Sequence, residues 1–294
     1  MKVGIVGAGA IGLLYGAKLT ENAEVIFFTK RKEQAEALAE KGVFLDGQHH
    51  QLAAREVDEL SQLAAGLDVL ILTMKSYQLD EFWPNLALLP EKLPLLFLQN
   101  GVAHLKQLAN CPQKIILVGS SEHGAVREND YTVSWRGKGR TNFSIWRGEL
   151  SDELLHLFQQ AGSDFPFIQK ATVEQVLRDK WFINLIINPL TAAFMCPNGD
   201  LLTKSAYRAE TRALVDEVAP LFQKEASFEK IQLICEQTAG NWSSMAEDVR
   251  HGRRTEIASI LLPALEAGEA QGVPLPRLTF LYHLIKGKEG ETHA

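Results

Sequence analysis

Cysteine is scarce in this sequence, and the few cysteines that occur show no pattern of disulfides or metal ligands. Cys111, Cys196 and Cys235 lie far apart in a chain of 294 residues. This odd number and wide spacing predict reduced, mostly buried thiols, as is typical of a cytoplasmic protein. The motifs H-E-x-x-H and G-x-S-x-G are also absent, so the sequence favours neither a metal enzyme nor a serine hydrolase, and we expect no metal.

The sequence also lacks an excess of basic residues and any long apolar run. Its 30 Lys and Arg against 36 Asp and Glu give a formal net charge of −6. Binding to nucleic acid needs clustered cations, so we expect no nucleic-acid partner, although a local basic pocket for a phosphorylated cofactor is compatible with this charge. No segment reaches the roughly 18–20 consecutive apolar residues of a membrane span, and glycines interrupt the apolar N-terminus, so we expect neither a membrane span nor a signal peptide.

The first half of the chain alternates short apolar segments with helical patterns. We expect strands at residues 2–6, 24–28, 67–73, 95–98 and 114–119. Helices are expected from the glycine loop to about residue 19 and at 32–41, with a hairpin within 43–52. The segments 131–135 and 142–146 alternate more and predict antiparallel strands. This alternation is typical of a doubly wound α/β, Rossmann-like dinucleotide-binding domain, which we place at residues 1–167. Strand patterns end near Pro166, and helical patterns then predict an all-α C-terminal domain at residues 168–294.

A G-x-G-x-x-G motif, Gly7-Ala8-Gly9-Ala10-Ile11-Gly12, follows the first expected strand and opens a helix. The first glycine permits a tight turn, the second lets the backbone approach a pyrophosphate, and the third permits close packing of the helix on the strand. The helix N-terminus faces the anion. In this context the motif predicts dinucleotide binding, whereas a merely glycine-rich turn does not explain all three spacings.

The end of the second expected strand indicates which dinucleotide is bound. NAD sites usually carry an Asp or Glu there for the ribose 2′-hydroxyl. This chain has Thr29-Lys30-Arg31-Lys32 instead, with three cations that suit the 2′-phosphate of NADPH. We expect Arg31 to bind that phosphate. The alternative is that the two lysines only solvate the start of a helix.

Lys180, Asn184 and Asn188 are spaced four residues apart in a segment that is otherwise largely apolar. On a helix they form one stripe, and buried polar groups need partners. A ligand with carboxylate and carbonyl groups would supply them; the alternative is a structural ladder of hydrogen bonds. Pro189 is expected to limit how far this helix runs straight, and Asn198 by itself predicts a turn.

Near the C-terminus, Ser243 and Ser244 with Glu247 predict the start of a helix. Thr255 and Glu256 form either another capping pair or a solvated face. The residues alone leave these alternatives open.

Together these segments resemble the ketopantoate reductase (2-dehydropantoate 2-reductase) family, almost from end to end. The matching pieces are GAGAIG at 7–12, Lys75 in TMKSYQ, QNG at 99–101, HGA at 123–125, KWFINLIINPLTA at 180–192, CPNG at 196–199, and the serines and Met245 at 243–245 followed by Thr255-Glu256. Their joint order and spacing make the resemblance specific.

The resemblance implies NADPH-dependent reduction of ketopantoate to pantoate in pantothenate synthesis. It implies that the cofactor is bound by Gly7, Gly9, Ala10, Ile11, Gly12, Arg31, Lys75, Asn100, Ala125 and Glu256. It implies that the substrate is bound by Asn100, Asn184, Asn188, Asn198 and Ser244. The catalytic residues would be Lys180, as the general acid that protonates the keto oxygen, and Glu256, which would orient Lys180 or the substrate hydroxyl.

One stretch departs from the family pattern, since Ala258 and Leu261-Leu262 stand where members often carry an acidic residue and an Asn-Gly. This departure bears on the acyl pocket. Two alternatives therefore stay open: a related NADP-dependent reductase of another small 2-oxo acid, and a non-catalytic NADPH-binding sensor. The helical half also offers surfaces for a homodimer, but the sequence contains no physical argument that it uses them.

Overall fold

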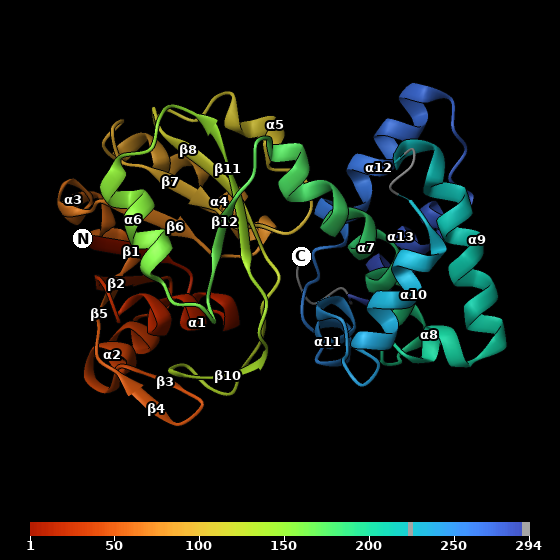
Figure 1. Cartoon of the computed structure of the whole chain (residues 1–294), viewed down its shortest axis with the longest axis horizontal. Helices are drawn as coiled ribbons and strands as arrows, with labels where there is room; N and C mark the ends of the chain where they lie inside the picture. Colours follow the sequence, from red (N-terminus) through yellow and green to blue (C-terminus); the bar gives the residue numbers. More distant parts are fainter. Residues whose placement is uncertain (223–225, 290–294) are drawn as a thin grey trace. The chain divides into compact units, whose positions relative to one another are not determined.

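The computed structural model describes residues 1–222 and 226–289, and its contacts divide the chain into two compact units. The first, here called the α/β unit, comprises Met1–Gln99 and Gln107–Leu177. The second, the helical unit, comprises Asn100–Lys106 and Arg178–Ala294. The boundary expected from the sequence, between 167 and 168, lies shortly before this change, and the short segment 100–106 clusters with the helices. Figure 1 traces both units along the chain.

The core of the α/β unit is an eight-stranded sheet in the order β12-β11-β8-β7-β6-β1-β2-β5. Its strands are β1 (Lys2–Val6), β2 (Glu24–Thr29), β5 (Ala53–Glu56), β6 (Val69–Leu72), β7 (Leu95–Phe97), β8 (Ile116–Ser121), β11 (Thr141–Arg147) and β12 (Phe167–Gln169). All neighbouring pairs are parallel except β8 with β11. Six adjacent strands of this sheet, β8-β7-β6-β1-β2-β5, have the Rossmann order, which confirms the predicted fold class.

Every strand predicted in the first half is present, but three short strands were missed. β5 is an edge strand with a polar sequence, AARE, and only one buried residue. β9 (Gly124–Arg127) is mostly exposed, and β12 lies beyond the point where strands were expected to end. Such segments are too short or too polar to give a periodic signal, because their pairing is decided by neighbouring strands.

A smaller sheet of four strands has the order β4-β3-β10-β9. Its other members are β3 (Val43–Leu45), β4 (Gln48–His50) and β10 (Thr132–Gly137). β3 and β4 form the predicted hairpin, in which Asp46 and Gly47 both have positive φ, 49° and 84°, as a two-residue I′ turn requires. β10 was predicted to be antiparallel; it is so toward β9, but it runs parallel to β3.

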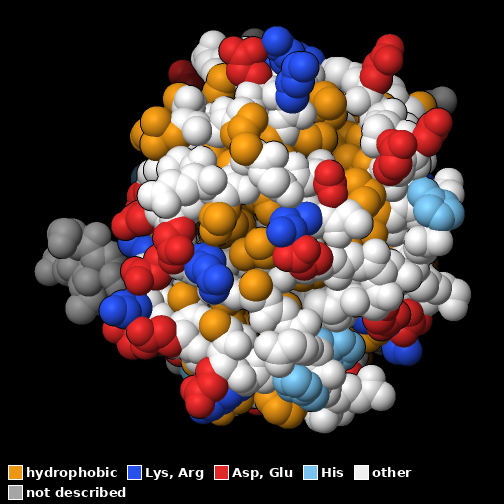
Figure 2. Space-filling model, turned by 90° about the vertical axis from the view of Figure 1, so that its left-hand side faces the viewer, with side chains coloured by type: hydrophobic (Ala, Val, Ile, Leu, Met, Phe, Trp, Pro, Cys, Tyr) orange, Lys and Arg blue, Asp and Glu red, His pale blue; other side chains and the backbone are white. Residues whose placement is uncertain are grey.

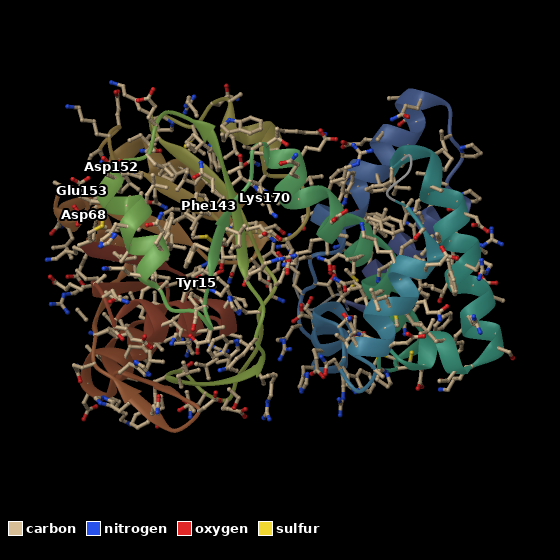
Figure 3. All side chains as sticks on the ribbon, in the orientation of Figure 1. Tyr15, Asp68, Phe143, Asp152, Glu153 and Lys170 are labelled. Atoms are coloured by element: carbon tan, nitrogen blue, oxygen red, sulfur yellow. The ribbon has the colours of Figure 1, made fainter. Side chains whose placement is uncertain are left out.

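The helices of the α/β unit are short apart from α1, α2 and α6. They are α1 (Ala10–Leu19), α2 (Lys32–Lys41), α3 (Leu60–Leu63), α4 (Ser76–Phe82), α5 (Leu105–Leu108, which crosses between the two units) and α6 (Asp152–Gln160), with 3-10 turns at Val57–Glu59, Ala64–Gly66 and Trp83–Leu88. α1 is almost entirely buried, including Tyr15, which Figure 3 labels together with Phe143 of β11. Burial raises the pKa of Tyr15 to about 12, so its hydroxyl serves as a neutral hydrogen-bonding group, paired with Thr141.

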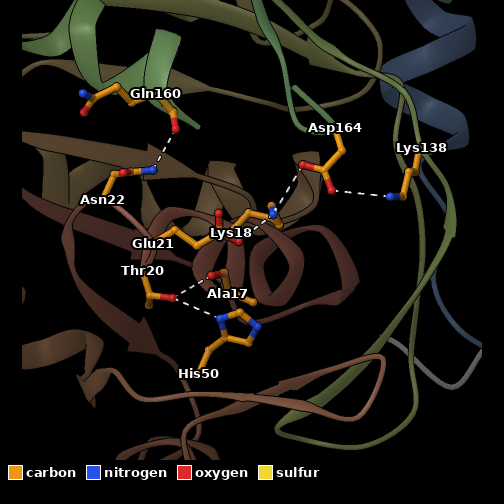
Figure 4. Close-up of polar contacts among 9 residues, drawn as sticks. All are labelled: Ala17, Lys18, Thr20, Glu21, Asn22, His50, Lys138, Gln160 and Asp164. Carbon is orange, nitrogen blue, oxygen red and sulfur yellow. Dashed lines mark hydrogen bonds and ion pairs between the residues drawn. The ribbon is translucent and has the colours of Figure 1, made fainter. Parts of the chain in front are cut away.

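The C-terminal end of α1 is fixed by polar contacts (Figure 4). Lys18 is only 8% exposed, and its Nζ lies 2.6 Å from Glu21 Oε1 and 3.4 Å from Asp164 Oδ1. Thr20 Oγ1 donates to the Ala17 carbonyl at 2.6 Å and lies 3.2 Å from His50 Nδ1. The two carboxylates satisfy the buried Lys18 ammonium, which would otherwise be costly to desolvate. All of these contacts hold the helix that begins at the glycine motif.

The helical unit packs its helices around a second apolar core. They are the part of α7 (Val173–Phe194) from Arg178 on, α8 (Asp200–Thr203), α9 (Ser205–Phe222), α10 (Phe228–Gln237), α11 (Ser244–Arg250), α12 (Ile257–Gln271) and α13 (Pro276–Lys288). Pro189, which was expected to limit how far this helix runs straight, does not end it, because α7 continues beyond it to Phe194. An interior proline costs roughly 3 kcal/mol, but burial of Ile186, Ile187 and Leu190 in the core offsets it.

The three cysteines are buried and unpaired, as predicted. None of the helices in the described part of the chain combines the length and apolar character that a membrane crossing requires. On the face shown in Figure 2, acidic and basic side chains are interspersed around small apolar areas.

His104 makes the stability of the protein sensitive to pH. Burial lowers the pKa of His104 to about 4, whereas an unfolded histidine titrates near 6.5. The unfolded state therefore binds more protons between these values, and stability that is fully present above about pH 6.5 is lost as the pH falls toward 4. We predict a loss of roughly 3 kcal/mol over this range, measured as urea unfolding free energy at several pH values.

The variant His104→Gln should flatten this pH dependence, whatever its own stability. The matched control is His156→Gln, since His156 is exposed on α6; it should keep the wild-type slope. An equally steep slope in His104→Gln would show that other groups cause the acid sensitivity.

Candidate functional site

The predicted cofactor residues of the α/β unit cluster at the carboxyl edge of the large sheet. The glycine motif follows β1, Arg31 follows β2 and Lys75 follows β6, and these three strands are adjacent and parallel. The strand order reverses direction between β1 and β6, and ligands of doubly wound sheets bind outside the carboxyl ends of the strands at such a point. The structure therefore brings these residues to one place.

The glycine motif forms a cradle that side chains would fill. Gly7 has φ +99°, and a Cβ there would lie 2.8 Å from the Met74 backbone nitrogen. A Cβ on Gly12 would lie 2.0 Å from the Gly7 carbonyl oxygen, so only glycine lets α1 begin so close to β1. A Cβ on Gly9, in contrast, would meet no protein atom within 4 Å. This open space above Gly9 is what a pyrophosphate approaching the backbone needs, so the residues fit a dinucleotide.

Ala10 and Ile11 are the first residues of α1, and both are half-buried. Their side chains add no polar group, but their backbone N–H groups lie at the helix N-terminus, where amides have no intrahelical partner. α1 is ten residues long, so its dipole adds to the attraction for an anion.

Two polar side chains to which the sequence analysis gave no role hold the strand ends in register. Thr73 Oγ1 donates to the Gly7 carbonyl at 2.6 Å. Gln99 is 3% exposed, and its Nε2 donates to the carbonyls of Leu72 at 3.0 Å and Met74 at 3.1 Å. They join the loops after β1, β6 and β7 and so place Lys75. Both could have been noticed only as polar residues next to strand ends.

Each of the three cations after β2 has an acidic partner. Lys30 Nζ lies 2.9 Å from Glu81 Oε2, and Lys32 Nζ lies 3.8 Å from Glu36 Oε1. The Arg31 guanidinium contacts the carboxylate of Asp130. Arg31 is also the N-cap residue of α2 and half-exposed, with 51% of its side chain accessible, so a phosphate could reach it.

Ala125 lies in the smaller sheet, where β9 pairs with β10. Its side chain packs against the core around α1, and both strands contact α1. It therefore belongs to the surroundings of the helix that the glycine motif begins.

In the helical unit, α7 carries the predicted polar stripe. Lys180 and Asn184 are half-buried, and Asn188 is 5% exposed. On other faces of the helix, Phe182 and Leu185 are fully buried in the apolar core. The sequence thus predicted both the helix and the arrangement of the stripe.

The Lys180 end of the stripe lies close to α12, because Trp181 Nε1 donates to the Ile260 carbonyl at 2.8 Å. Glu256, the residue before α12, is 7% exposed, and its Oε2 accepts from Asn100 Nδ2 at 2.9 Å. Two residues expected at the site from distant parts of the sequence are thus joined directly. A Cβ on the neighbouring Gly101 would lie 2.2 Å from the Ser259 carbonyl oxygen, so glycine there permits this close packing.

Asn198 lies in the turn between α7 and α8 and is 8% exposed. Its Nδ2 donates to Thr238 Oγ1 at 2.9 Å, and Thr238 Oγ1 donates its own proton to the Ile234 carbonyl at 2.6 Å. The threonine can therefore only accept from Asn198. This leaves Asn198 Oδ1 as a buried acceptor, with no hydrogen-bond partner among the described residues.

Ser243, not Ser244, caps α11: its Oγ accepts from the Ala246 N–H at 3.1 Å. It also lies 2.7 Å from Thr191 Oγ1, one turn beyond Asn188. Ser244 is the first residue of α11 and exposed. The structure thus links the Asn188 end of the stripe to the start of α11, where Ser244 lies. Within the described ranges, no group of three or more His, Cys, Asp or Glu side chains is placed to hold a metal ion.

Comparison with known proteins identifies the family of this chain. The family model described as ketopantoate reductase PanE/ApbA matches residues 3–148, and the model of the C-terminal part of that family matches residues 172–289. The chain belongs to the ketopantoate reductase family. This places it among the oxidoreductases and confirms the resemblance inferred from its motifs.

Relatives in the ketopantoate reductase family match over the whole chain. A 2-dehydropantoate 2-reductase of Listeria innocua is 43% identical over 298 residues, which cover 100% of this chain and 98% of the relative. A relative of the same name from Bacillus subtilis is 36% identical, over 100% of this chain and 99% of the relative. A crystal structure of a probable 2-dehydropantoate 2-reductase from Bacillus subtilis superposes with a TM-score of 0.84 at 34% identity, covering 98% of this chain and 100% of that one.

The fold extends to proteins with other activities. A D-mandelate dehydrogenase in complex with NADH and anilino(oxo)acetate has a TM-score of 0.84 at 24% identity, covering 98% of both chains. At that identity the likeness concerns the fold alone, so fold by itself does not select a substrate.

Because the space at Gly9 is open, a substitution there can affect dinucleotide binding without changing the stability of the fold. Gly9 has φ −79° and ψ −171°, a conformation that alanine adopts without strain. We predict that Gly9→Ala keeps the wild-type melting temperature but weakens dinucleotide binding by about tenfold or more, because a methyl group takes the place of the approaching pyrophosphate. Thermal unfolding and a direct NADPH titration would measure the two effects.

Two other glycines serve as controls for Gly9→Ala. Gly66→Ala also meets open space and should change neither property, while Gly12→Ala should lower the melting temperature because of its backbone clash. Wild-type NADPH affinity in Gly9→Ala would mean that no phosphate lies over this glycine.

Proposed function

We propose that this protein reduces the keto group of ketopantoate (2-dehydropantoate) with NADPH, giving pantoate for pantothenate synthesis in the cytoplasm. The observation that carries the proposal is the stripe of Lys180, Asn184 and Asn188 on α7, joined to elements that bear Glu256 and Ser244. The names of relatives that match the whole chain support the same substrate.

The α/β unit would bind the cofactor. Gly7, Gly9 and Gly12, with the amides of Ala10 and Ile11, would take the pyrophosphate. Arg31 would take the 2′-phosphate, because β2 does not end in the Asp or Glu that usually binds a ribose 2′-hydroxyl. Lys75, Asn100, Ala125 and Glu256 would complete the cofactor contacts, as the family resemblance implies. The bound nicotinamide supplies a hydride to the keto carbon.

Lys180 would act as the general acid. Negative charge develops on the keto oxygen as the carbonyl is reduced, and a nearby ammonium group stabilises this charge and then donates a proton. Half-burial of Lys180 strengthens that interaction relative to water. Glu256 would orient Lys180 or the substrate hydroxyl, and its bond to Asn100 keeps the carboxylate in a fixed position.

The amides would orient the substrate. Asn184 and Asn188 lie further along the stripe from Lys180 and would bind the carboxylate and neighbouring groups. Asn198, whose amide is oriented by Thr238, would bind the hydroxyl and carboxylate region of the substrate together with them. Ser244, exposed at the start of α11, would assist.

The proposed substrate and cofactor can be tested together. We predict rapid oxidation of NADPH with ketopantoate and slower oxidation with 2-oxo acids that lack its hydroxyl, such as 3-methyl-2-oxobutanoate. Oxidation is measured by the loss of NADPH absorbance, and the same assays are run in parallel with NADH. Faster turnover of another 2-oxo acid would assign the protein to that substrate, and Ala258 to Leu262 would then be the stretch to vary. Tight NADPH binding without turnover of any of these acids would favour a non-catalytic role.

The role of Lys180 has its own test. We predict that Lys180→Ala lowers kcat by about 100-fold or more, the range typical of general acids, while the Kd for NADPH stays close to wild type. Lys180→Arg keeps the positive charge but holds its proton too tightly to donate it. It should therefore be impaired as well, and near-wild-type turnover in either variant would exclude Lys180 as the acid.

A further inference from the structure

Asp130 is a charged residue beside the predicted 2′-phosphate site that has no assigned role. It lies in the turn between β9 and β10 and is half-buried, with 32% of its side chain exposed. Its carboxylate contacts the guanidinium of Arg31 and lies 3.5 Å from Arg127 Nη1. Asp130 is thus shared between two arginines, one of which is the proposed phosphate ligand.

The turn that carries Asp130 is held firmly in place. The Glu128 N–H donates to the Thr132 carbonyl at 2.9 Å, and the Tyr131 N–H donates to Asn129 Oδ1 at 3.0 Å. The Phe44 N–H donates to the Tyr131 carbonyl at 2.8 Å, which anchors the turn to β3. Asp130 therefore stays beside Arg31 because of the backbone, and not only because of their opposite charges.

A buried glutamine ties this turn to the glycine motif. Gln34 is 6% exposed, and its Nε2 donates to the carbonyls of Ala8 at 2.9 Å and Asp130 at 3.1 Å. One amide group thus spans the loop that would hold the pyrophosphate and the turn that bears Asp130. The Asp130 carboxylate is consequently held beside the place where the cofactor ribose is expected.

We propose that Asp130 competes with the cofactor 2′-phosphate for Arg31 and so limits the preference for NADPH over NADH. The proposal rests on the role of Arg31 in the proposed function. Binding of NADPH must separate Arg31 from Asp130, whereas binding of NADH leaves the pair intact. The carboxylate of Asp130, which contacts Arg31, would also repel a 2′-phosphate bound there, and NADH lacks that phosphate.

Because of Arg127, Arg31 can leave Asp130 for the phosphate without leaving the Asp130 carboxylate unpaired. When Arg31 turns to the phosphate, Asp130 keeps its contact with Arg127, whose side chain is exposed. An ion pair near the protein surface contributes little to stability, so a phosphate dianion can displace it. Asp130 therefore reduces the NADPH preference and does not abolish it.

The test is a direct titration of the protein with NADPH and with NADH, without substrate, followed by nicotinamide fluorescence. We predict that Asp130→Asn tightens NADPH binding about three- to fivefold, the size expected for releasing one exposed ion pair, and changes the NADH Kd less than twofold. The gain should shrink at high salt, because exposed charges are screened.

Glu36→Gln is the matched control. It removes one negative charge from the same unit, from an exposed residue that pairs with Lys32 and not with Arg31. It should change the NADPH Kd less than Asp130→Asn does. Equal effects in the two variants would mean that Asp130 acts only through the net charge of the protein, and would overturn the proposal.

Arg31→Ala, alone and combined with Asp130→Asn, separates this inference from the proposed function. We expect Arg31→Ala to weaken NADPH binding much more than NADH binding, and Asp130→Asn to lose its effect in that background. An unchanged preference in Arg31→Ala would overturn the role of Arg31 and the inference with it. A normal effect of Arg31→Ala with unchanged or weaker NADPH binding in Asp130→Asn would overturn the inference alone.

Discussion

The close approach of α1 to the end of β1 is the constraint on which the α/β unit depends. No side chain fits between Gly12 and the Gly7 carbonyl, so the helix starts directly on the strand. The first amides of α1 have no intrahelical partner, and they lie beside the open space over Gly9. Packing and anion binding thus have one cause, and Thr73, Gln99 and Gln34 serve to hold neighbouring loops around this point.

In the helical unit, the constraint is to keep a polar stripe on α7, where most of the neighbouring residues are apolar. Phe182, Leu185 and Ile186 pack into the core and fix the rotation of α7. Bonds to its neighbours then fix its position, through Trp181 toward α12 and through Thr191 toward α11. Polar groups held by a rigid helix in this way are pre-organised, which is what stabilisation of a developing charge requires.

Charge near the expected 2′-phosphate site is balanced locally and not left in excess. The cations after β2 are each paired with a carboxylate, so a phosphate that binds there, as we propose, would have to exchange partners with existing ion pairs. Affinity is then a difference between similar interactions, and specificity depends on which carboxylate is displaced. This is a different physical picture from the basic pocket that the sequence suggests.

The sequence by itself determined the Rossmann fold of the first half, the helical second half, the glycine cradle and the stripe on α7, because each has a local period or spacing. Tertiary structure alone decided what depends on distant neighbours: the pairing of the short strands β5, β9 and β12, and the continuation of α7 through Pro189. The same holds for the bond of Asn100 to Glu256, the orientation of Asn198 by Thr238 and the pairing of Arg31 with Asp130. Asp130 in REND looks like a solvated turn residue, and only the fold brings it across 99 positions to Arg31. Local patterns report backbone conformation and burial, whereas partners of polar side chains are chosen by contacts between segments far apart in the chain.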